Sequence, residues 1–230
     1  MEPLPDDVDR VLAVAAHPDD LEYGVSAAVA AWTAAGKEVT YLLVTRGEAG
    51  IATTHPGEAG PAREAEERAS AAAVGVHDVR FLDGHADGTV VEGLALRRDI
   101  CRVVRDVRPD LVVTLNHHER WAGGVGWNSA DHRAVGRAAI DAVSDAGTRW
   151  IFSDEGAAHS PRHIAVAASA HPTHEVDVTG FVEAAVASLA CHRRYLEALS
   201  DDPVQEQARA VVERMVGDPA APRVRFELLF

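Results

Sequence analysis

The chain is 230 residues long, has 47% hydrophobic residues and carries a formal net charge of −14. A chain of this length can bury one sizeable core, so we expect a single domain that spans residues 1–230. Binding to nucleic acid or to an anionic membrane surface depends on many basic contacts, which such an acidic chain does not offer. The charge therefore argues against polyanionic partners.

The first ten residues, MEPLPDDVDR, are acidic where a signal peptide is basic, and no apolar run is long enough to span a bilayer. The two cysteines, Cys101 and Cys191, do not form a CxxC pair. A chain without a disulfide framework suits a reducing compartment. We therefore predict a cytoplasmic protein without membrane insertion, and the sequence leaves open whether it forms a homo-oligomer.

Short apolar runs alternate with segments of helical periodicity along the first two thirds of the chain. Runs rich in Val and Leu predict strands, and apolar positions three or four residues apart predict helices. Pro61 suits the first turn of a helix, where proline is best tolerated. The expected strands are 11–15, 39–44, 79–82 and 111–115, and the expected helices begin at Leu21, Pro61, Leu94 and Asp131.

Beyond Trp150 the alternation weakens, and we expect a strand at 164–168 and helices at 182–199 and 204–216. Short strands that are apolar on both faces and separated by helices predict a parallel sheet covered on both sides. The predicted fold class is therefore α/β, with a Rossmann-like, mostly parallel sheet and helices on both faces. In such sheets ligands bind beyond the carboxyl ends of the strands.

Polar side chains follow the first predicted strand in the run VLAVAAHPDDLEYG. His17 and Asp20 stand three residues apart in a turn that contains Pro18, so both are able to face one ion. A catalytic metal site needs about three protein ligands and an open position for water. His132 is the best candidate for the third ligand, because it begins a helix just after the fourth strand and so lies at the same edge of the sheet.

With these residues in place, the sequence resembles a known family. The pair of motifs, AHPDD after the first strand and DH at the start of a later helix, is similar to that of the LmbE/PIG-L family of metal-dependent N-acetylglucosaminyl deacetylases. Four further segments extend the resemblance over the first two thirds of the chain: TRGEAG, REAEERASAAAVGV, FLDGHADG and RPDLVVT.

The resemblance implies an LmbE-like fold and a zinc-dependent hydrolase that removes an N-acyl group, typically acetyl, from an amino sugar or sugar conjugate. It makes His17, Asp20 and His132 the zinc ligands and Asp19 the general base. Zinc lowers the pKa of bound water to about 7 and polarises the amide carbonyl. Asp19 would take the proton of the water and return it to the leaving amine. An iron(II) ion suits the same three ligands.

Many members of this family have a second histidine three residues before the last ligand, where this chain has Ser129. The acid role then falls to Asp19 alone or to a histidine brought in by a loop. His118 and His171 are the candidates for that histidine and for contact with the substrate.

The expected substrate is a neutral or weakly anionic N-acylated sugar or sugar conjugate. Arg46 and Arg63 are expected near its polar groups, where they would offset a carboxylate or one phosphate. Trp121 and Trp127 lie in a glycine-rich loop and are expected to offer aromatic surface to a sugar. This loop, residues 117–130, and the loop 46–60 are expected to close over the bound substrate.

Each of these features has a structural alternative. Asp19 and Asp20 are able to cap a helix and complement its dipole, and Arg63 can be an ordinary exposed helix residue. The two tryptophans can pack a small core of their own. Asp131 is either an acid of the first helical turn or a hydrogen-bond partner of a ligand. The remaining histidines expected at the surface or in local hydrogen bonds are His55, His77, His85, His159, His163 and His192.

Two other function classes stay open. A non-catalytic Rossmann-like binding module would carry no stoichiometric ion, although no GxGxxG phosphate cradle follows the first strand. Two histidines and one carboxylate also form the facial triad of non-haem iron oxygenases, which consume oxygen. The alternating α/β pattern and the paired aspartates favour hydrolysis.

Overall fold

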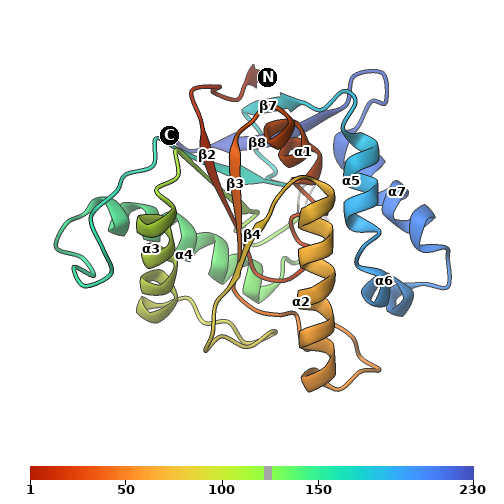
Figure 1. The fold of residues 1–230 in the computed structure, drawn as a ribbon, viewed down its shortest axis with the longest axis horizontal. Helices are drawn as coiled ribbons and strands as arrows, with labels where there is room; N and C mark the ends of the chain where they lie inside the picture. The colour runs from red at the N-terminus through yellow and green to blue at the C-terminus, as the bar shows by residue number, and fades with distance from the viewer. Residues whose placement is uncertain (122–125) are drawn as a thin grey trace.

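A single twisted sheet lies at the centre of the computed structural model, which describes residues 1–121 and 126–230 (Figure 1). Its strands are β1 (Glu2–Pro3), β2 (Arg10–Ala15), β3 (Glu38–Leu43), β4 (Asp78–Phe81), β5 (Leu111–Leu115), β6 (His163–Ala167), β7 (His174–Asp177) and β8 (Arg223–Leu228). In this part of the chain the strand order is β1-β7-β8-β6-β5-β2-β3-β4. The neighbours from β6 to β4 pair in parallel, whereas β8 runs antiparallel to both β6 and β7.

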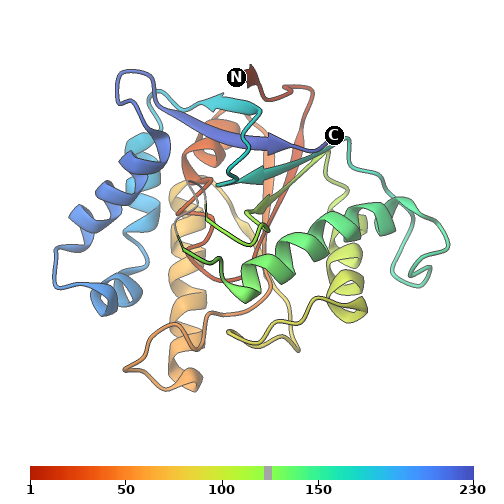
Figure 2. The same ribbon diagram turned by 180° about the vertical axis from the view of Figure 1, so that it is seen from behind.

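Helices cover both faces of the sheet. They are α1 (Ser26–Ala34), α2 (Pro56–Ala73), α3 (Leu94–Val107), α4 (Ala130–Gly147), α5 (Val182–Leu189), α6 (Arg193–Leu199) and α7 (Val204–Val216). Figures 1 and 2 show α3 and α4 on one face and α1, α2, α5, α6 and α7 on the other. The predicted α/β class with a mostly parallel sheet is therefore confirmed.

The central strand β2 shows why its sequence is apolar at every position. Successive side chains of a strand point to opposite faces of the sheet. Leu12 and Val14 pack into the core beneath α3 and α4. Val11 and Ala13 pack into the core beneath α1 and α5. Since both faces are buried, the strand lacks the polar alternation of a half-exposed sheet.

Several element boundaries differ from the prediction. The first helix begins at Ser26 rather than Leu21, and the residues before it, 21–25, form turns. The second helix begins at Pro56, which takes the first-turn position, so that Pro61 lies inside the helix. The segment predicted as one helix over 182–199 is two helices, since the backbone of His192 has φ −76° and ψ 50°. Strands β1, β7 and β8 were not predicted.

The carboxyl ends of the parallel strands β2, β3, β4 and β5 lie at one edge of the sheet. The polar residues at 17–20, 45–46, 83 and 116–117 follow these strand ends. The part of the loop 117–130 that comprises residues 122–125 lies outside the described residues. Within the described ranges, no helix combines the length and apolar character needed to cross a membrane.

Candidate metal centre

The structure brings the three predicted ligands together. One ligand atom from each of His17, Asp20 and His132 lies within 4.8 Å of the others. The Asp20 carboxylate is shared, because Oδ1 lies 3.0 Å from His132 Nε2 and Oδ2 lies 3.5 Å from His17 Nδ1. Two imidazoles and one carboxylate are a common donor set for catalytic zinc.

The other ring nitrogen of His17 is held by two further carboxylates. Its Nε2 lies 3.1 Å from Asp131 Oδ2 and 3.1 Å from Asp87 Oδ1. Asp131 is itself fixed, because it also accepts hydrogen bonds from the backbone N–H groups of Gly88 and Val90. A carboxylate on one imidazole nitrogen orients the ring and leaves the other nitrogen free for a metal. Nδ1 of His17 therefore faces Asp20 and is the nitrogen available to an ion shared with Asp20 and His132, while Asp131 and Asp87 hold Nε2; His17, Asp87 and Asp131 form a second group of possible ligands.

Negative charge is in excess around these imidazoles. Burial opposes a positive charge on His17, yet Asp20, Asp131 and Asp87 raise the pKa of His17 to about 12. Burial would raise the pKa of Asp20, but His132 and His17 hold it well below its usual value. These carboxylates favour a positive charge between them, so the cluster suits a divalent cation. A bound cation would replace the proton on each imidazole nitrogen that it contacts.

Asp19 lies beside the ligands but points to a different partner. Its backbone has φ 88°, which is unusual for a residue other than glycine. Oδ1 of Asp19 accepts a hydrogen bond from Arg63 Nη2 at 2.9 Å, and its backbone N–H donates to Glu67 Oε2 at 3.1 Å. Burial raises the pKa of Asp19 to about 6, although Arg63 opposes the shift. A carboxylate with a pKa near neutrality suits general-base chemistry.

The alternative that Arg63 is an ordinary exposed helix residue is wrong, since its side chain is buried and the residue is only 2% exposed. Its guanidinium also donates to the carbonyls of Gly47 and Pro18. Gly47 has φ 61°, and a Cβ at this position would lie 2.2 Å from Arg63 Nη1. The glycines of the TRGEAG segment therefore leave room for the arginine beneath Asp19.

A cavity of about 890 Å³ opens over the candidate metal centre. His17, Asp19, Asp20, Asp87 and His132 form its polar end. The remaining lining residues are Tyr23, Gly50, Arg63, Trp121, Ser129, Ala168, Tyr195, Arg214 and Met215. A cavity of this size lies at the upper end of the range for small-molecule sites, so it has room for more than one sugar ring.

The structure separates the two predicted tryptophans. Trp121 lines the cavity and meets the His132 ring edge-on, with 5.4 Å between the ring centroids. Trp127 lies away from the cavity lining and is 58% exposed. Its ring faces the guanidinium groups of Arg120 and Arg133.

Three other predicted contacts are not brought to the described cavity wall. Arg46 pairs with Glu64 and Asp83. His118 lies 3.0 Å from Glu227 and meets the ring of His171 edge-on. Ser129 does line the cavity, but its hydroxyl caps α4 by accepting a hydrogen bond from the backbone of Asp131.

Several lining residues were missed in the sequence. Asp87 stands in the FLDGHADG segment that resembles the family, and that segment was the available signal. Tyr195, Arg214 and Met215 come from α6 and α7, whose sequences carry no motif. His192, expected at the surface or in a local hydrogen bond, is fully buried. Burial opposes a charge on its ring, but Glu22 and Glu67 raise the pKa of His192 to about 9.

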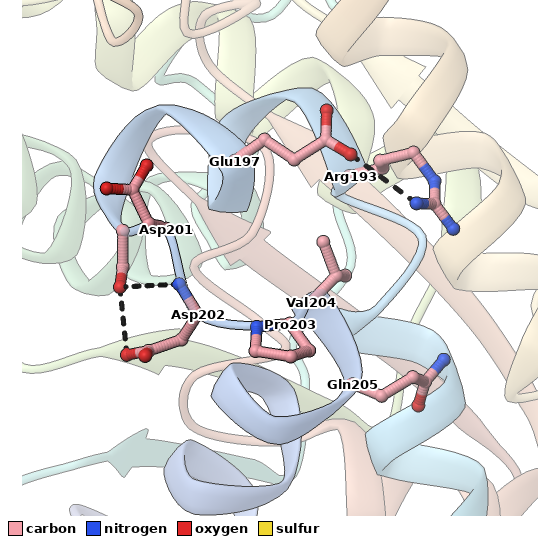
Figure 3. A pocket seen from close by; sticks show the side chains of 8 residues that line it. Arg193, Glu197, Asp201, Asp202, Pro203, Val204 and Gln205 are labelled. Carbon is pink, nitrogen blue, oxygen red and sulfur yellow. Dashed lines mark hydrogen bonds and ion pairs between the residues drawn. The ribbon is translucent and has the colours of Figure 1, made fainter.

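A second hollow, of about 560 Å³, lies at the connection between α6 and α7 (Figure 3). Arg193 and Glu197 form an ion pair in its wall, and the Asp202 carboxylate accepts a hydrogen bond from Ser200. The described wall of this hollow holds no predicted ligand or base. It is therefore separate from the candidate metal centre.

The fold and site define an α/β protein with a two-histidine, one-carboxylate centre at the carboxyl ends of its parallel strands. Residues 12–143 match the model of the PIG-L family, described as GlcNAc-PI de-N-acetylase. The chain belongs to this family.

The sequence is also similar to those of named deacetylases. The chain is 30% identical over 192 residues to the diacetylchitobiose deacetylase of Thermococcus kodakarensis, across 81% of this chain and 70% of that protein. It is 32% identical over 182 residues to a 1D-myo-inositol 2-acetamido-2-deoxy-alpha-D-glucopyranoside deacetylase of Geodermatophilus obscurus. That alignment covers 65% of this chain and 58% of the relative, so the chain spans less than two thirds of that protein.

Solved structures show the same fold. N,N'-diacetylchitobiose deacetylase from Pyrococcus horikoshii superposes with a TM-score of 0.84 at 22% identity, over 97% of this chain and 84% of that chain. A 4-carboxy-2-hydroxymuconate hydratase from Pseudomonas putida superposes with a TM-score of 0.73 at 18% identity, over 96% of each chain. Because a hydratase and a deacetylase share the fold, the reaction must be argued from the site.

Proposed function

We propose that this protein is a zinc-dependent N-deacetylase that removes the acetyl group from an N-acetylglucosamine-containing sugar or sugar conjugate. The observation that carries the proposal is the convergence of His17, Asp20 and His132 beside the buried Asp19 at the polar end of one cavity. The family match and the two named deacetylases support the same chemistry.

In this proposal His17, Asp20 and His132 hold the zinc ion. When bound, zinc lowers the pKa of a water molecule and polarises the amide carbonyl. Asp131 and Asp87 fix the orientation of His17 through its Nε2. Asp20 is fixed from the backbone, because its Oδ2 accepts hydrogen bonds from the N–H groups of Ala16 and His17.

Asp19 takes the proton of the attacking water and returns it to the nitrogen of the leaving amine. Water adds to the amide carbon, the C–N bond breaks, and acetic acid and the free amine leave. Arg63 Nη2 lies 2.9 Å from Asp19 Oδ1, so the second carboxylate oxygen is the one available for the proton. Because His118 and His171 are not part of the described cavity wall, Asp19 carries both the base and the acid role in this proposal.

The shape and lining of the cavity support this choice of substrate. Trp121, Tyr23 and Tyr195 offer aromatic surface on which the apolar face of a sugar can rest. The relatives named above act on different N-acetylated sugars, so the acetamido sugar is the shared feature. The net charge of −14 disfavours a highly anionic substrate.

The test is release of free amine from N-acetylglucosamine, diacetylchitobiose and N-acetylglucosaminyl-inositol by the zinc-loaded protein. Asp19→Asn should retain zinc and lose about 10²–10⁴-fold in rate. Ser129→Ala is the control, since Ser129 lines the cavity but its hydroxyl caps a helix. No amine release from any of these substrates, or parallel loss of zinc and activity in Asp19→Asn, would contradict the proposal.

Two measurements address the alternatives. A binding module would hold no stoichiometric ion and release no amine. A non-haem iron oxygenase would consume oxygen in proportion to turnover when loaded with iron(II). Hydrolysis without oxygen consumption is the result expected here.

A further inference from the structure

A cluster of three ionisable side chains lies behind Asp19, away from the described cavity wall. We call Glu22, Glu67 and His192 the buried triad. Their side chains are fully buried, and they come from the segment after β2, from α2 and from the α5–α6 connection. His192 Nε2 lies 3.5 Å from Glu22 Oε2 and 3.6 Å from Glu67 Oε2.

Glu67 joins the buried triad to the active site. Its Oε2 accepts the backbone N–H of Asp19 at 3.1 Å, while Arg63 holds the side chain of the same aspartate at 2.9 Å. Arg63 and Glu67 are four residues apart on α2, so they lie on the same face of the helix. Helix α2 therefore holds Asp19 by two hydrogen bonds, one to its backbone and one to its carboxylate.

These two hydrogen bonds hold a residue whose backbone is strained. Asp19 has φ 88°, and a residue other than glycine keeps such a conformation only when its surroundings enforce it. The hydrogen bond to Glu67 is part of that enforcement. If it is lost, the peptide before Asp19 can relax and carry the carboxylate away from its catalytic position.

The other members of the buried triad hold Glu67 in place. Two buried carboxylates so close together need a compensating group, and His192 lies between them. Glu22 is fixed in turn, because its Oε1 accepts a hydrogen bond from Ser70 Oγ at 2.7 Å. Close polar contacts therefore run from Glu22 through His192 to Glu67 and on to the backbone of Asp19.

We propose that Glu67, supported by His192 and Glu22, is a positioning residue that fixes Asp19 for proton transfer. The inference rests on the proposed function, in which Asp19 is the base. Displacement of a reacting group by about 1 Å can cost on the order of 10²-fold in rate. Glu67 does not touch the substrate cavity within the described lining, so its effect is expected in kcat and not in KM.

The experiment compares Glu67→Met and Glu67→Gln, each in the wild-type and in an Asp19→Asn background. Glutamine keeps an oxygen that can accept the Asp19 N–H, whereas methionine has a similar length and lacks that acceptor. Glu67→Met should lower kcat on the order of 10²-fold with unchanged KM and zinc content. Glu67→Gln should recover most of that loss.

In the Asp19→Asn background, Glu67→Met should cause no further loss, because the group that it positions is already removed. The matched control is Glu66→Met, which changes the neighbouring carboxylate of α2. Glu66 accepts the backbone N–H of Arg194, whereas the backbone N–H of Asp19 donates to Glu67, so kcat should stay unchanged in Glu66→Met. If Glu67→Met does not fold, His192→Gln allows the same comparison in both backgrounds.

An equal proportional loss in both backgrounds would overturn the inference, because it would show a general structural role. A second bound ion per chain that disappears in His192→Gln would also overturn it, because the buried triad would then be a cation site. Failure of the wild-type protein to release any amine would instead refute the proposed function, and this inference with it. Loss in the wild-type background alone, with zinc retained, is the supporting result.

Discussion

Removal of the Arg63 guanidinium should both destabilise the protein and shift its pH dependence. In Arg63→Met, the buried Asp19 carboxylate loses its ion-pair partner, and the carbonyls of Gly47 and Pro18 lose a donor. Asp19 can escape the uncompensated charge by taking up a proton. From a pKa of about 6, protonation at pH 7 costs about 1.4 kcal/mol, which limits the electrostatic part of the loss.

The two carbonyls left without their donor add about 1–3 kcal/mol each. These contributions sum to about 3–7 kcal/mol. We expect the free energy of unfolding to fall by the lower part of that range, about 3–5 kcal/mol, which is typical of a broken buried ion pair. For a chain of this length that corresponds to a melting temperature lower by roughly 6–20 °C. Thermal unfolding followed by circular dichroism measures the change. Arg68→Met is the control on the same helix, because Arg68 is half-exposed and pairs with Glu64, and it should cost about 1 kcal/mol or less.

The same variant should change the pH profile of kcat/KM. Arg63 lowers the pKa of Asp19, so its removal raises that pKa further above its usual value. The base is active only when deprotonated, and the acid limb of the profile should therefore move to higher pH. A variant with an unchanged melting temperature and acid limb but a raised KM would refute this reasoning and would make Arg63 a substrate-binding residue.

Three further predictions concern the metal centre and the cavity. His132→Ala should keep its circular dichroism spectrum and lose most of its zinc by elemental analysis; full occupancy would mean that another residue is the third ligand. In the wild-type protein kcat/KM should fall about tenfold per pH unit below a pH of about 6, because Asp19 becomes protonated there, and a flat profile between pH 5 and 7 would contradict this. Trp121→Ala should lower kcat/KM more for an acetylated sugar than for a minimal acetamide, whereas Trp127→Ala, outside the cavity lining, should leave both unchanged; equal losses for the two substrates in Trp121→Ala would argue against a sugar platform.

The local pattern of the sequence was enough to predict the parallel core. The segments 111–115 and 204–216 were predicted with the bounds that the structure shows for β5 and α7. Their periodicity reports burial directly, since β5 is buried on both faces and α7 on one. Ligands of parallel sheets bind beyond the carboxyl ends of the strands, which share one edge. This predicted that His17, Asp20 and His132 would meet. Their catalytic roles, the cytoplasmic location and the single-domain organisation remain predictions.

Sequence patterns were less informative where an element takes its place from distant partners. Strand β8 alternates buried Val224 and Phe226 with polar residues, yet only its pairing with β6 and β7 decides that it runs antiparallel. His192 is followed by Arg193 and Arg194 in the sequence, and its burial follows from the docking of the α5–α6 connection against α2.

The same limit applies to the site. The sequence by itself determined which candidate ligands come together and which edge of the sheet holds them. Only the tertiary structure decided that Arg63 contacts Asp19. It also decided that Trp121 and not Trp127 lines the cavity, and that Tyr195 of α6 lines it too. Periodicity records whether a side chain is buried, whereas the identity of its partner depends on how helices far apart in the chain pack against one another.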